Sequence, residues 1–290
     1  MTLERITSIQ EGILVELAEF QYLTTPQLCR LTGRKRSRTN ELINGLFKRH
    51  KPLVHSNSYT IDSKTGRKPS IHFLLPRGEK ILSEMGSYEG LIKLPRRYSV
   101  DFTSDYTHRV LTIETLVSAK LWAKENGYRF SFSQFYFQQK KGSNRDNKGG
   151  KSLSANRIDV DTRGIGYIIP DGVFLIEKEG ENPLFGLVEQ HNGTETKRVL
   201  EQIHAHCVAI HEGSPSITLD IQHNGKYIAN RVFITFERES CMLATMKRLL
   251  QSSDFTPFKN LFYFALSEDI EKKSFSDCWF YVDGAKVDLK

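Results

Sequence analysis

Long hydrophobic runs are absent from this 290-residue sequence. A membrane-spanning helix needs roughly 20 consecutive apolar residues, and no stretch of the chain comes close to that length. The opening residues, MTLERITSIQEG, also contain no apolar segment of the signal-peptide type. We therefore expect a protein that has no membrane partner and is not exported.

Cysteine is also scarce. The four cysteines lie far apart, with no paired spacing, at Cys29, Cys207, Cys241 and Cys278. This pattern argues against a disulfide framework or a zinc ribbon and favours a reducing, cytoplasmic location. Hydrophobic residues make up 39% of the chain and charged residues 26%, as in ordinary globular proteins. The length allows two domains.

Acidic residues are few in the first hundred positions, where 17 Lys and Arg stand against 9 Asp and Glu. That segment carries a net charge of +8, whereas the remainder, with 24 basic and 25 acidic side chains, carries −1. Such a concentration of positive charge suits a polyanionic partner. A solvated basic surface would have the same composition, so charge alone does not separate the two interpretations.

Helical patterns dominate the start of the chain. Apolar residues at helical spacing predict a first helix over 6–20. A second helix is expected from Thr25, which would cap it, to Gly33, where glycine would end it. A third is expected over 37–50, capped by Ser37. Helix, short helix, turn and helix is the order of a helix-turn-helix motif.

A predicted β-hairpin follows the third helix. The β-rich runs 58–61 and 70–75 flank the turn-forming residues of 62–69. Pro76 and Gly86 then bound a fourth helix. A basic hairpin directly after a recognition helix is typical of a winged helix, which we predict for residues 1–86.

Basic and polar residues at both ends of the third helix, and at the hairpin tip, predict contact with double-stranded DNA. The N-terminal residues of a recognition helix meet base edges, and flanking basic residues bind phosphates. Arg38 suits guanine and Asn40 suits adenine. The predicted DNA-binding residues are Arg34, Lys35, Arg36, Arg38, Thr39, Asn40, Lys48, Arg49, Lys64, Arg67 and Lys68. A solvated helix end is the alternative.

Residues 87–104 show no clear periodicity and are predicted to be a linker, and 105–290 form a second domain. Its expected elements alternate: a helix over 106–127, a strand over 128–137 and, after a polar loop over 138–157, further strands and helices. The segment 167–177 is predicted as one strand interrupted by an aspartate. A hairpin turn at 179–183 joins it to a strand over 183–191, which a helix over 192–210 follows.

Two carboxylates are expected to converge in this second domain. Asp171 interrupts an apolar strand, which costs free energy unless a cation or hydrogen bonds compensate. Glu189 and His191 lie on one face of the neighbouring strand, beside Asp171 if the hairpin pairs in register. Oxygen ligands at this position suit Mg²⁺ or Mn²⁺, which activates a scissile phosphate.

These residues also carry a family resemblance. Pro170-Asp171, a hairpin and Glu189-x-His191 resemble the PD-(D/E)XK motif of restriction-endonuclease-like nucleases. A winged helix, a THR helix, a PDG strand and an E-x-h-x-GTE segment together resemble replication-relaxation proteins, a family that includes plasmid mobilisation relaxases. The resemblance covers nearly the whole chain and implies an α/β (α+β) protein in which a restriction-endonuclease-like mixed-sheet domain follows the winged helix.

The resemblance implies a protein of a plasmid or mobile element that binds DNA at an origin of transfer or replication, with metal-dependent nicking in some members. Asp171 and Glu189 match the metal-binding acids, and Glu114 matches an extra acid of the preceding helix. His191 occupies the usual lysine position, and Lys197 is a candidate substitute. The alternative is a non-catalytic regulator of replication or transfer. Other mobilisation or replication proteins, or further copies of the chain, are possible partners.

Structural explanations remain open for each of these residues. Asp171-Gly172 would also suit a β-bulge, and Glu189 would also suit an ion pair with Arg198. Asn192 and Glu195 have the spacing of a capping box. His204 and His206 superficially resemble a histidine metal motif, but in a helix they point about 200° apart, so they are expected to be surface or core residues.

Overall fold

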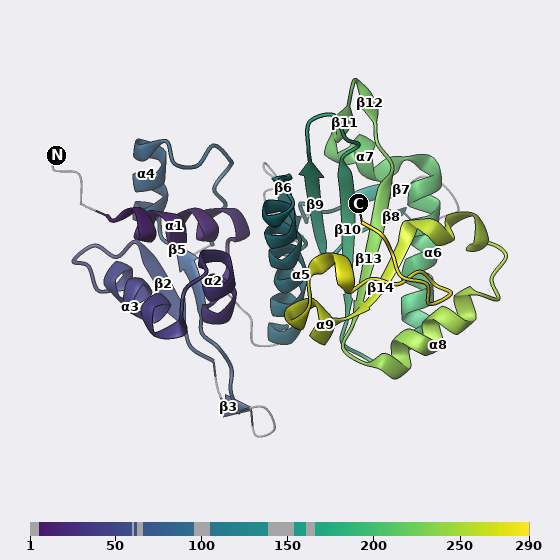
Figure 1. Cartoon of the computed structure of the whole chain (residues 1–290), viewed down its shortest axis with the longest axis horizontal. Helices are drawn as coiled ribbons and strands as arrows, with labels where there is room; N and C mark the ends of the chain where they lie inside the picture. The colour runs from purple at the N-terminus through teal and green to yellow at the C-terminus, as the bar shows by residue number, and fades with distance from the viewer. Residues whose placement is uncertain are drawn as a thin grey trace, which may run out of the picture. The chain divides into compact units, whose positions relative to one another are not determined.

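The computed structural model describes residues 6–59, 61–62, 66–95, 105–138, 154–160 and 166–289. Helices and mixed sheets make it an α/β protein, as predicted. The chain divides into two compact units, 1–110 and 111–290 (Figure 1). The division falls inside helix α5 (Tyr106–Glu125), after the predicted linker, because the first turn of α5 packs with the first unit. Residues 96–104 of that linker lie outside the described residues.

The first unit contains four helices and a small antiparallel sheet within the part of the chain that the structure describes. Its sheet has the order β1-β5-β2, and β3 and β4 extend the β2–β5 hairpin. The helices bury one apolar side each, with Leu14, Leu17, Leu28 and Leu46 among the core residues. The elements are α1 (Ser8–Phe20), β1 (Leu23–Thr24), α2 (Thr25–Thr32), α3 (Arg36–Phe47), β2 (Val54–Asn57), β3 (Ile61–Asp62), β4 (Gly66–Arg67), β5 (Ile71–Leu74) and α4 (Pro76–Met85).

The helix ends differ in part from the predictions. Gly33 and Gly86 adopt the left-handed conformation and end α2 and α4, as expected. The cap of α2 is Thr24 rather than Thr25, because Thr24 and Gln27 form a reciprocal capping box. Ser37 does not cap α3, which begins one residue earlier and has no side-chain cap hydrogen bond. The first strand of the hairpin is 54–57, earlier than predicted.

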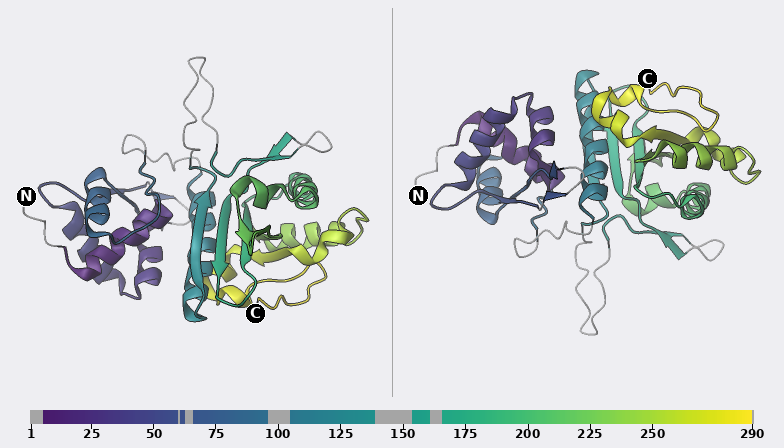
Figure 2. Two further views of the ribbon diagram at one scale, coloured as in Figure 1. Left: turned by 90° about the horizontal axis from the view of Figure 1, so that it is seen from above. Right: turned by 90° about the horizontal axis from the view of Figure 1, so that it is seen from below.

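The second unit has a five-stranded mixed sheet in the order β14-β13-β10-β9-β6. Strands β10, β13 and β14 are parallel, whereas β9 is antiparallel to both β10 and β6. Helices α5 and α9 cover one face of this sheet, and Ser118 of α5 forms a hydrogen bond to α9. Helices α6 and α8 pack on the other face (Figure 2). The main strands and helices are β6 (Arg129–Phe135), β9 (Gly172–Glu177), β10 (Leu184–His191), α6 (Thr196–Glu212), β13 (Asn230–Phe236), α8 (Glu239–Leu249), β14 (Phe262–Leu266) and α9 (Ser267–Lys272).

Smaller elements fill the edges of this unit. The strand pairs β7–β8 and β11–β12 lie outside the main sheet, and α7 follows α6 after the left-handed Gly213. These elements are β7 (Ile158–Val160), β8 (Gly166–Ile168), α7 (Ser214–Leu219), β11 (Gln222–His223), β12 (Lys226–Tyr227) and the 3₁₀ turns η3 (Thr256–Leu261) and η4 (Phe275–Asp277). Among the described helices, none has the length and apolar composition needed to cross a membrane.

The predicted single strand over 167–177 is wrong. The segment forms β8 and β9, which belong to different sheets. Pro170 separates them: it has no N–H to donate to a sheet, and its carbonyl accepts a hydrogen bond from the buried side chain of Asn156. Most of the predicted loop over 138–157 lies outside the described residues.

Gly172 is explained by packing rather than by a β-bulge. It pairs in regular register with Val188, and a Cβ at this position would lie 2.8 Å from Leu116 Cδ1 of α5. The glycine therefore lets α5 approach the sheet closely next to Asp171. The irregularity in this part of the sheet lies instead in β6, between Phe130 and Phe132.

Candidate functional sites

One side of α3 is exposed and polar. Its buried residues are Thr39, Leu42, Ile43 and Leu46, which leaves Arg36, Asn40 and Asn44 at four-residue spacing on the exposed side. Lys35, Arg38 and Lys48 are also exposed, and Arg34 and Arg49 are half-buried. Most of the residues predicted from the sequence for this helix are therefore on its surface.

Thr39 is an exception and corrects the prediction. Its side chain is fully buried, and its hydroxyl group lies 3.3 Å from both Cys29 Sγ and the carbonyl oxygen of Lys35. It joins α2 to α3 and is not available to a ligand. The position was misassigned because the prediction followed the polar residue type, although Thr39 lies three, four and seven residues before Leu42, Ile43 and Leu46 and so shares their side of the helix.

Arg38 is bonded to a neighbour on the same helix. Its guanidinium lies 2.6 Å from the carboxylate of Glu41, and the two side chains are 48% and 66% exposed. An exposed pair of this kind contributes only about 0.5 kcal/mol. An anionic ligand would therefore displace Glu41 at little cost.

The hairpin carries two described basic residues. Arg67 is exposed in β4, whereas the Lys68 ammonium lies 5.0 Å from the centre of the Tyr106 ring. The Tyr106 hydroxyl donates to the carbonyl of Pro69, which fixes the ring against the hairpin. Lys64, also predicted to bind DNA, lies outside the described residues.

A buried histidine connects the hairpin to α3. His72 in β5 lies 2.7 Å from Ser56 Oγ through Nδ1 and 2.9 Å from Thr25 Oγ1 through Nε2. Thr25 in turn donates to Asn40 Oδ1 at 3.3 Å. Burial lowers the pKa of His72 to about 4, so its imidazole is neutral near pH 7. We call these four residues the His72 chain.

In the second unit, the register places the two predicted acids opposite each other. Val188 pairs with Gly172 in the antiparallel β9–β10 ladder, so the next step of the ladder brings Glu189 opposite Asp171. Asp171 Oδ2 accepts a hydrogen bond of 2.8 Å from the backbone N–H of Gln190. The predicted antiparallel pairing of the two strands, on which the expected convergence of the acids depends, is confirmed.

Glu189 bonds to His206 of α6. Glu189 Oε1 lies 2.6 Å from His206 Nε2, and the side chains are only 5% and 2% exposed. Burial lowers the pKa of His206 to about 4, although the charge of Asp171 acts in the opposite direction. Burial thus favours the neutral imidazole, whose Nε2–H can donate to the Glu189 side chain. Arg198, the alternative partner considered for Glu189, is exposed.

Sequence reasoning missed this role of His206. It did predict that His204 and His206 lie on different sides of a helix, which is confirmed: His204 is exposed and His206 is buried in α6. The helical period identifies His206 as inward-facing, but it does not identify which strand residue the ring meets. The predicted capping box is wrong, because Glu195 is itself the N-cap and makes no side-chain cap bond.

A neutral polar network lies beside the acidic pair. Gln190 donates from Nε2 to Asn192 Oδ1 and to Ser267 Oγ, and it accepts at Oε1 from the hydroxyl of Thr235 at 2.6 Å. These contacts join the ends of β10, β13 and α9. No pattern in the sequence predicted this network, because it joins side chains from three elements that are far apart along the chain.

The remaining predicted site residues differ in their surroundings. Lys197 is 82% exposed and lies 3.9 Å from Glu201 on the same helix, so it does not substitute for the missing lysine. His191 ends β10, half-buried, with its ring 5.3 Å from that of Phe236. Glu114 is buried on α5.

Asp171 and Glu189 both bind protein donors in the structure. Asp171 and Glu189 each have one oxygen bonded to a protein donor, and the group against Glu189 is an imidazole rather than another oxygen ligand. Within the described ranges, no three His, Cys, Asp or Glu side chains form a group that could hold a metal. The predicted ligand set of Glu114, Asp171 and Glu189 stays a prediction.

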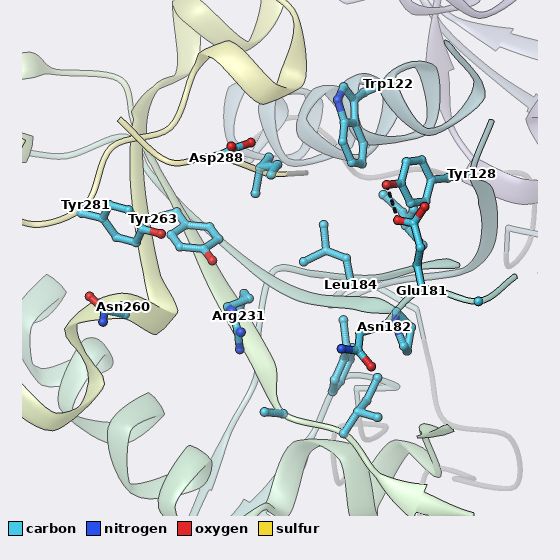
Figure 3. A pocket seen from close by; sticks show the side chains of 17 residues that line it. Trp122, Tyr128, Glu181, Asn182, Leu184, Arg231, Asn260, Tyr263, Tyr281 and Asp288 are labelled. Atoms are coloured by element: carbon cyan, nitrogen blue, oxygen red, sulfur yellow. Dashed lines mark hydrogen bonds between the residues drawn. The ribbon is translucent and has the colours of Figure 1, made fainter. Parts of the chain in front are cut away.

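A separate cleft of about 1110 Å³ lies at the opposite ends of the parallel strands (Figure 3). Arg231, Tyr263 and Tyr281 line one side of it. On the other side Tyr128 stacks on Trp122, with ring centres 5.3 Å apart. The Lys178 ammonium lies 4.7 Å from the Tyr128 ring, so protein groups already cover the Tyr128 ring.

No family model, curated protein or solved structure matches this chain. The resemblance to replication-relaxation proteins stays a prediction that rests on the motifs of the sequence.

Proposed function

We propose that this chain is a double-stranded-DNA-binding protein that regulates replication or transfer of a plasmid or mobile element. The observation that carries the proposal is the exposed polar side of α3, where Arg36, Arg38, Asn40 and Lys48 are all accessible. A recognition helix requires such a surface. The net charge of +8 in the first hundred residues supports a polyanionic partner.

The order of elements in the first unit supports the same proposal. A winged helix has three helices followed by a hairpin, and α1, α2, α3 and the β2–β5 hairpin occur in that order. Contacts between α3 and β2 place the helix beside the hairpin (Figure 1). This arrangement suits insertion of α3 in the major groove while Arg67 contacts the backbone.

Binding of duplex DNA over a range of salt concentrations tests the proposal. We expect wild-type affinity to fall steeply with salt, since each phosphate contact contributes about 0.9 to the slope of log K against log salt. A triple variant of Arg36→Ala, Arg38→Ala and Lys48→Ala should bind weakly and with a flatter slope. Three exposed lysines of the second unit, changed together to alanine, provide a matched control: Lys124, Lys226 and Lys247. Equal losses in both triple variants would reject α3 as the interface.

Metal-dependent nicking of DNA is a second candidate function. The sequence resemblance implies it, and the pairing of β9 with β10, beside Asp171 and Glu189, favours it. The bond of Glu189 to His206 favours the non-catalytic alternative. Supercoiled plasmid incubated with the full chain and Mg²⁺ or Mn²⁺ separates the two. Cleavage by wild type that is lost in Asp171→Ala would establish the nuclease. Intact plasmid with both proteins would leave DNA binding as the function.

A further inference from the structure

Asn40 is unusual among the exposed polar residues of α3 because its side chain is bonded to a residue of another helix. Its Oδ1 accepts from Thr25 of α2 at 3.3 Å, although Asn40 itself is exposed. An amide can rotate by half a turn and exchange its donor and acceptor positions. In the structure the amide has Oδ1 on the side of Thr25, which donates to it.

The donor directions along the His72 chain are mutually consistent. The Thr25 hydroxyl has one proton, which it donates to Asn40, so it must accept from His72 Nε2–H. The neutral ring then has a bare Nδ1, which accepts from the hydroxyl of Ser56. Each of the three donors is used once, and each of the three acceptors faces a donor.

Burial makes this set of directions stable. His72 and Thr25 are only 4% and 5% exposed, so water does not compete for their hydrogen bonds, and breaking one of these bonds would leave a buried polar atom unsatisfied. With Thr25 donating to Asn40, the chain of bonds runs from Ser56 on β2 through β5 and α2 to the surface of α3.

We propose that the His72 chain is a positioning device that holds the Asn40 amide with Oδ1 toward Thr25 and Nδ2 outward, so that Asn40 donates to N7 of a purine in the major groove. N7 is an acceptor in both adenine and guanine. This inference rests on the proposed function, and it modifies the prediction that Asn40 selects adenine: the fixed group is a donor, and the contact it specifies is the purine N7.

The experiment starts from a preferred site, selected by the full-length wild-type protein from a random-sequence duplex library. Binding is then measured to that site and to the same site with each purine replaced in turn by its 7-deaza analogue. We expect one such replacement to weaken wild type by roughly 2- to 13-fold, the range for a single hydrogen bond, and to have no effect on Asn40→Ala.

Three changes test the positioning residues. Thr25→Val removes the hydroxyl and keeps the shape, Thr25→Ser retains the hydroxyl, and Ser56→Ala removes the far donor without approaching Asn40. We expect Thr25→Val and Ser56→Ala to lose most of the discrimination against the 7-deaza site, and Thr25→Ser to regain it. Ser58→Ala is the control, because Ser58 bonds to Ser70 and not to His72.

The outcomes separate this inference from the proposed function. If wild type does not bind duplex DNA, both are wrong. If wild type discriminates against a 7-deaza site but Ser56→Ala and a folded Thr25→Val discriminate equally well, DNA binding stands and the positioning role is overturned. If Asn40→Ala keeps full discrimination, Asn40 is not the contact, and the inference is overturned in the same way.

Discussion

His206 Nε2 lies 2.6 Å from Glu189 Oε1, in a part of the second unit where both side chains are almost fully buried. The pair links α6 to β10 at the position where a nuclease of the predicted type would use its second acid. A buried carboxylate that has a hydrogen-bond donor lowers the stability of the fold only a little. One that loses its donor lowers the stability by several kcal/mol. The pair therefore contributes to folding whether or not the site binds a ligand.

Removal of His206 should destabilise the second unit. We expect His206→Ala to lower the free energy of unfolding by about 3 kcal/mol, because Glu189 stays buried without a donor. Trp122 and Trp279 both lie in this unit, so their fluorescence during urea denaturation reports its unfolding. His204→Ala is the control and should change stability by less than about 0.5 kcal/mol, since His204 is exposed. Equal effects of the two changes would contradict the importance of the pair.

Acidification should destabilise the first unit through His72. The pKa of His72 is about 4 in the folded protein, because burial disfavours the charged ring, against an ordinary value of 6.5. Between these values the unfolded chain binds a proton that the folded chain does not, so stability falls as pH falls from 6.5 to 4. At 1.36 kcal/mol per pKa unit, the full effect is about 3 kcal/mol.

Proton NMR of the full chain measures this effect directly. The His72 ring signals should not titrate above about pH 5, and urea stability followed by signals of the first unit should decline over the same window. His72→Gln should show a weaker decline. A His72 ring that titrates near 6.5 would show that burial does not lower its pKa.

Gly172 should not tolerate a side chain. An alanine Cβ would lie 2.8 Å from Leu116 Cδ1, and overpacking of this kind costs about 1–3 kcal/mol. We expect Gly172→Ala to lower the urea midpoint, and Leu116→Ala in the same chain to reduce the additional loss. Gly193→Ala is the control, since its Cβ would meet nothing closer than 3.9 Å. If Gly172→Ala is as stable as wild type, α5 can move away from the sheet at this point and the prediction is wrong.

Arg38→Ala should relax sequence preference in DNA binding. Loss of a base contact costs about 1–3 kcal/mol against the preferred site and much less against random DNA. Its exposed pair with Glu41 contributes little to folding, so the thermal midpoint should stay within a few degrees of wild type. Competition binding with preferred and random duplexes measures the difference. An equal loss for both duplexes would make Arg38 a phosphate contact.

Arg67→Ala should instead weaken binding to every duplex. The residue is exposed in β4 of the hairpin, where a wing contacts the DNA backbone. We expect the slope of log K against log salt to become flatter by about 0.9, the contribution of one phosphate. Binding titrations at several salt concentrations measure it. An unchanged slope would remove β4 from the interface.

The sequence alone located much of the fold. The apolar period and the positions of Pro76, Gly33 and Gly86 were sufficient to predict the helices of the first unit. The apolar patterns of 172–177 and 184–191 and the turn between them were sufficient to predict the antiparallel pairing of β9 with β10. These features depend on local geometry, because a helix or strand fixes the direction of each side chain relative to its own axis.

The tertiary structure decided which side chains meet. His206 bonds to Glu189 although they are 17 residues apart in the sequence, and Thr25 bonds to His72 although they are 47 apart. The apolar period of one element does not predict which other element packs against it. The same reason explains Thr39, which is buried because α2 covers it. The sequence determined which side of each element faces inward, and only the packed structure determined the partner that each inward-facing polar group found there, since a buried donor or acceptor requires one specific neighbour.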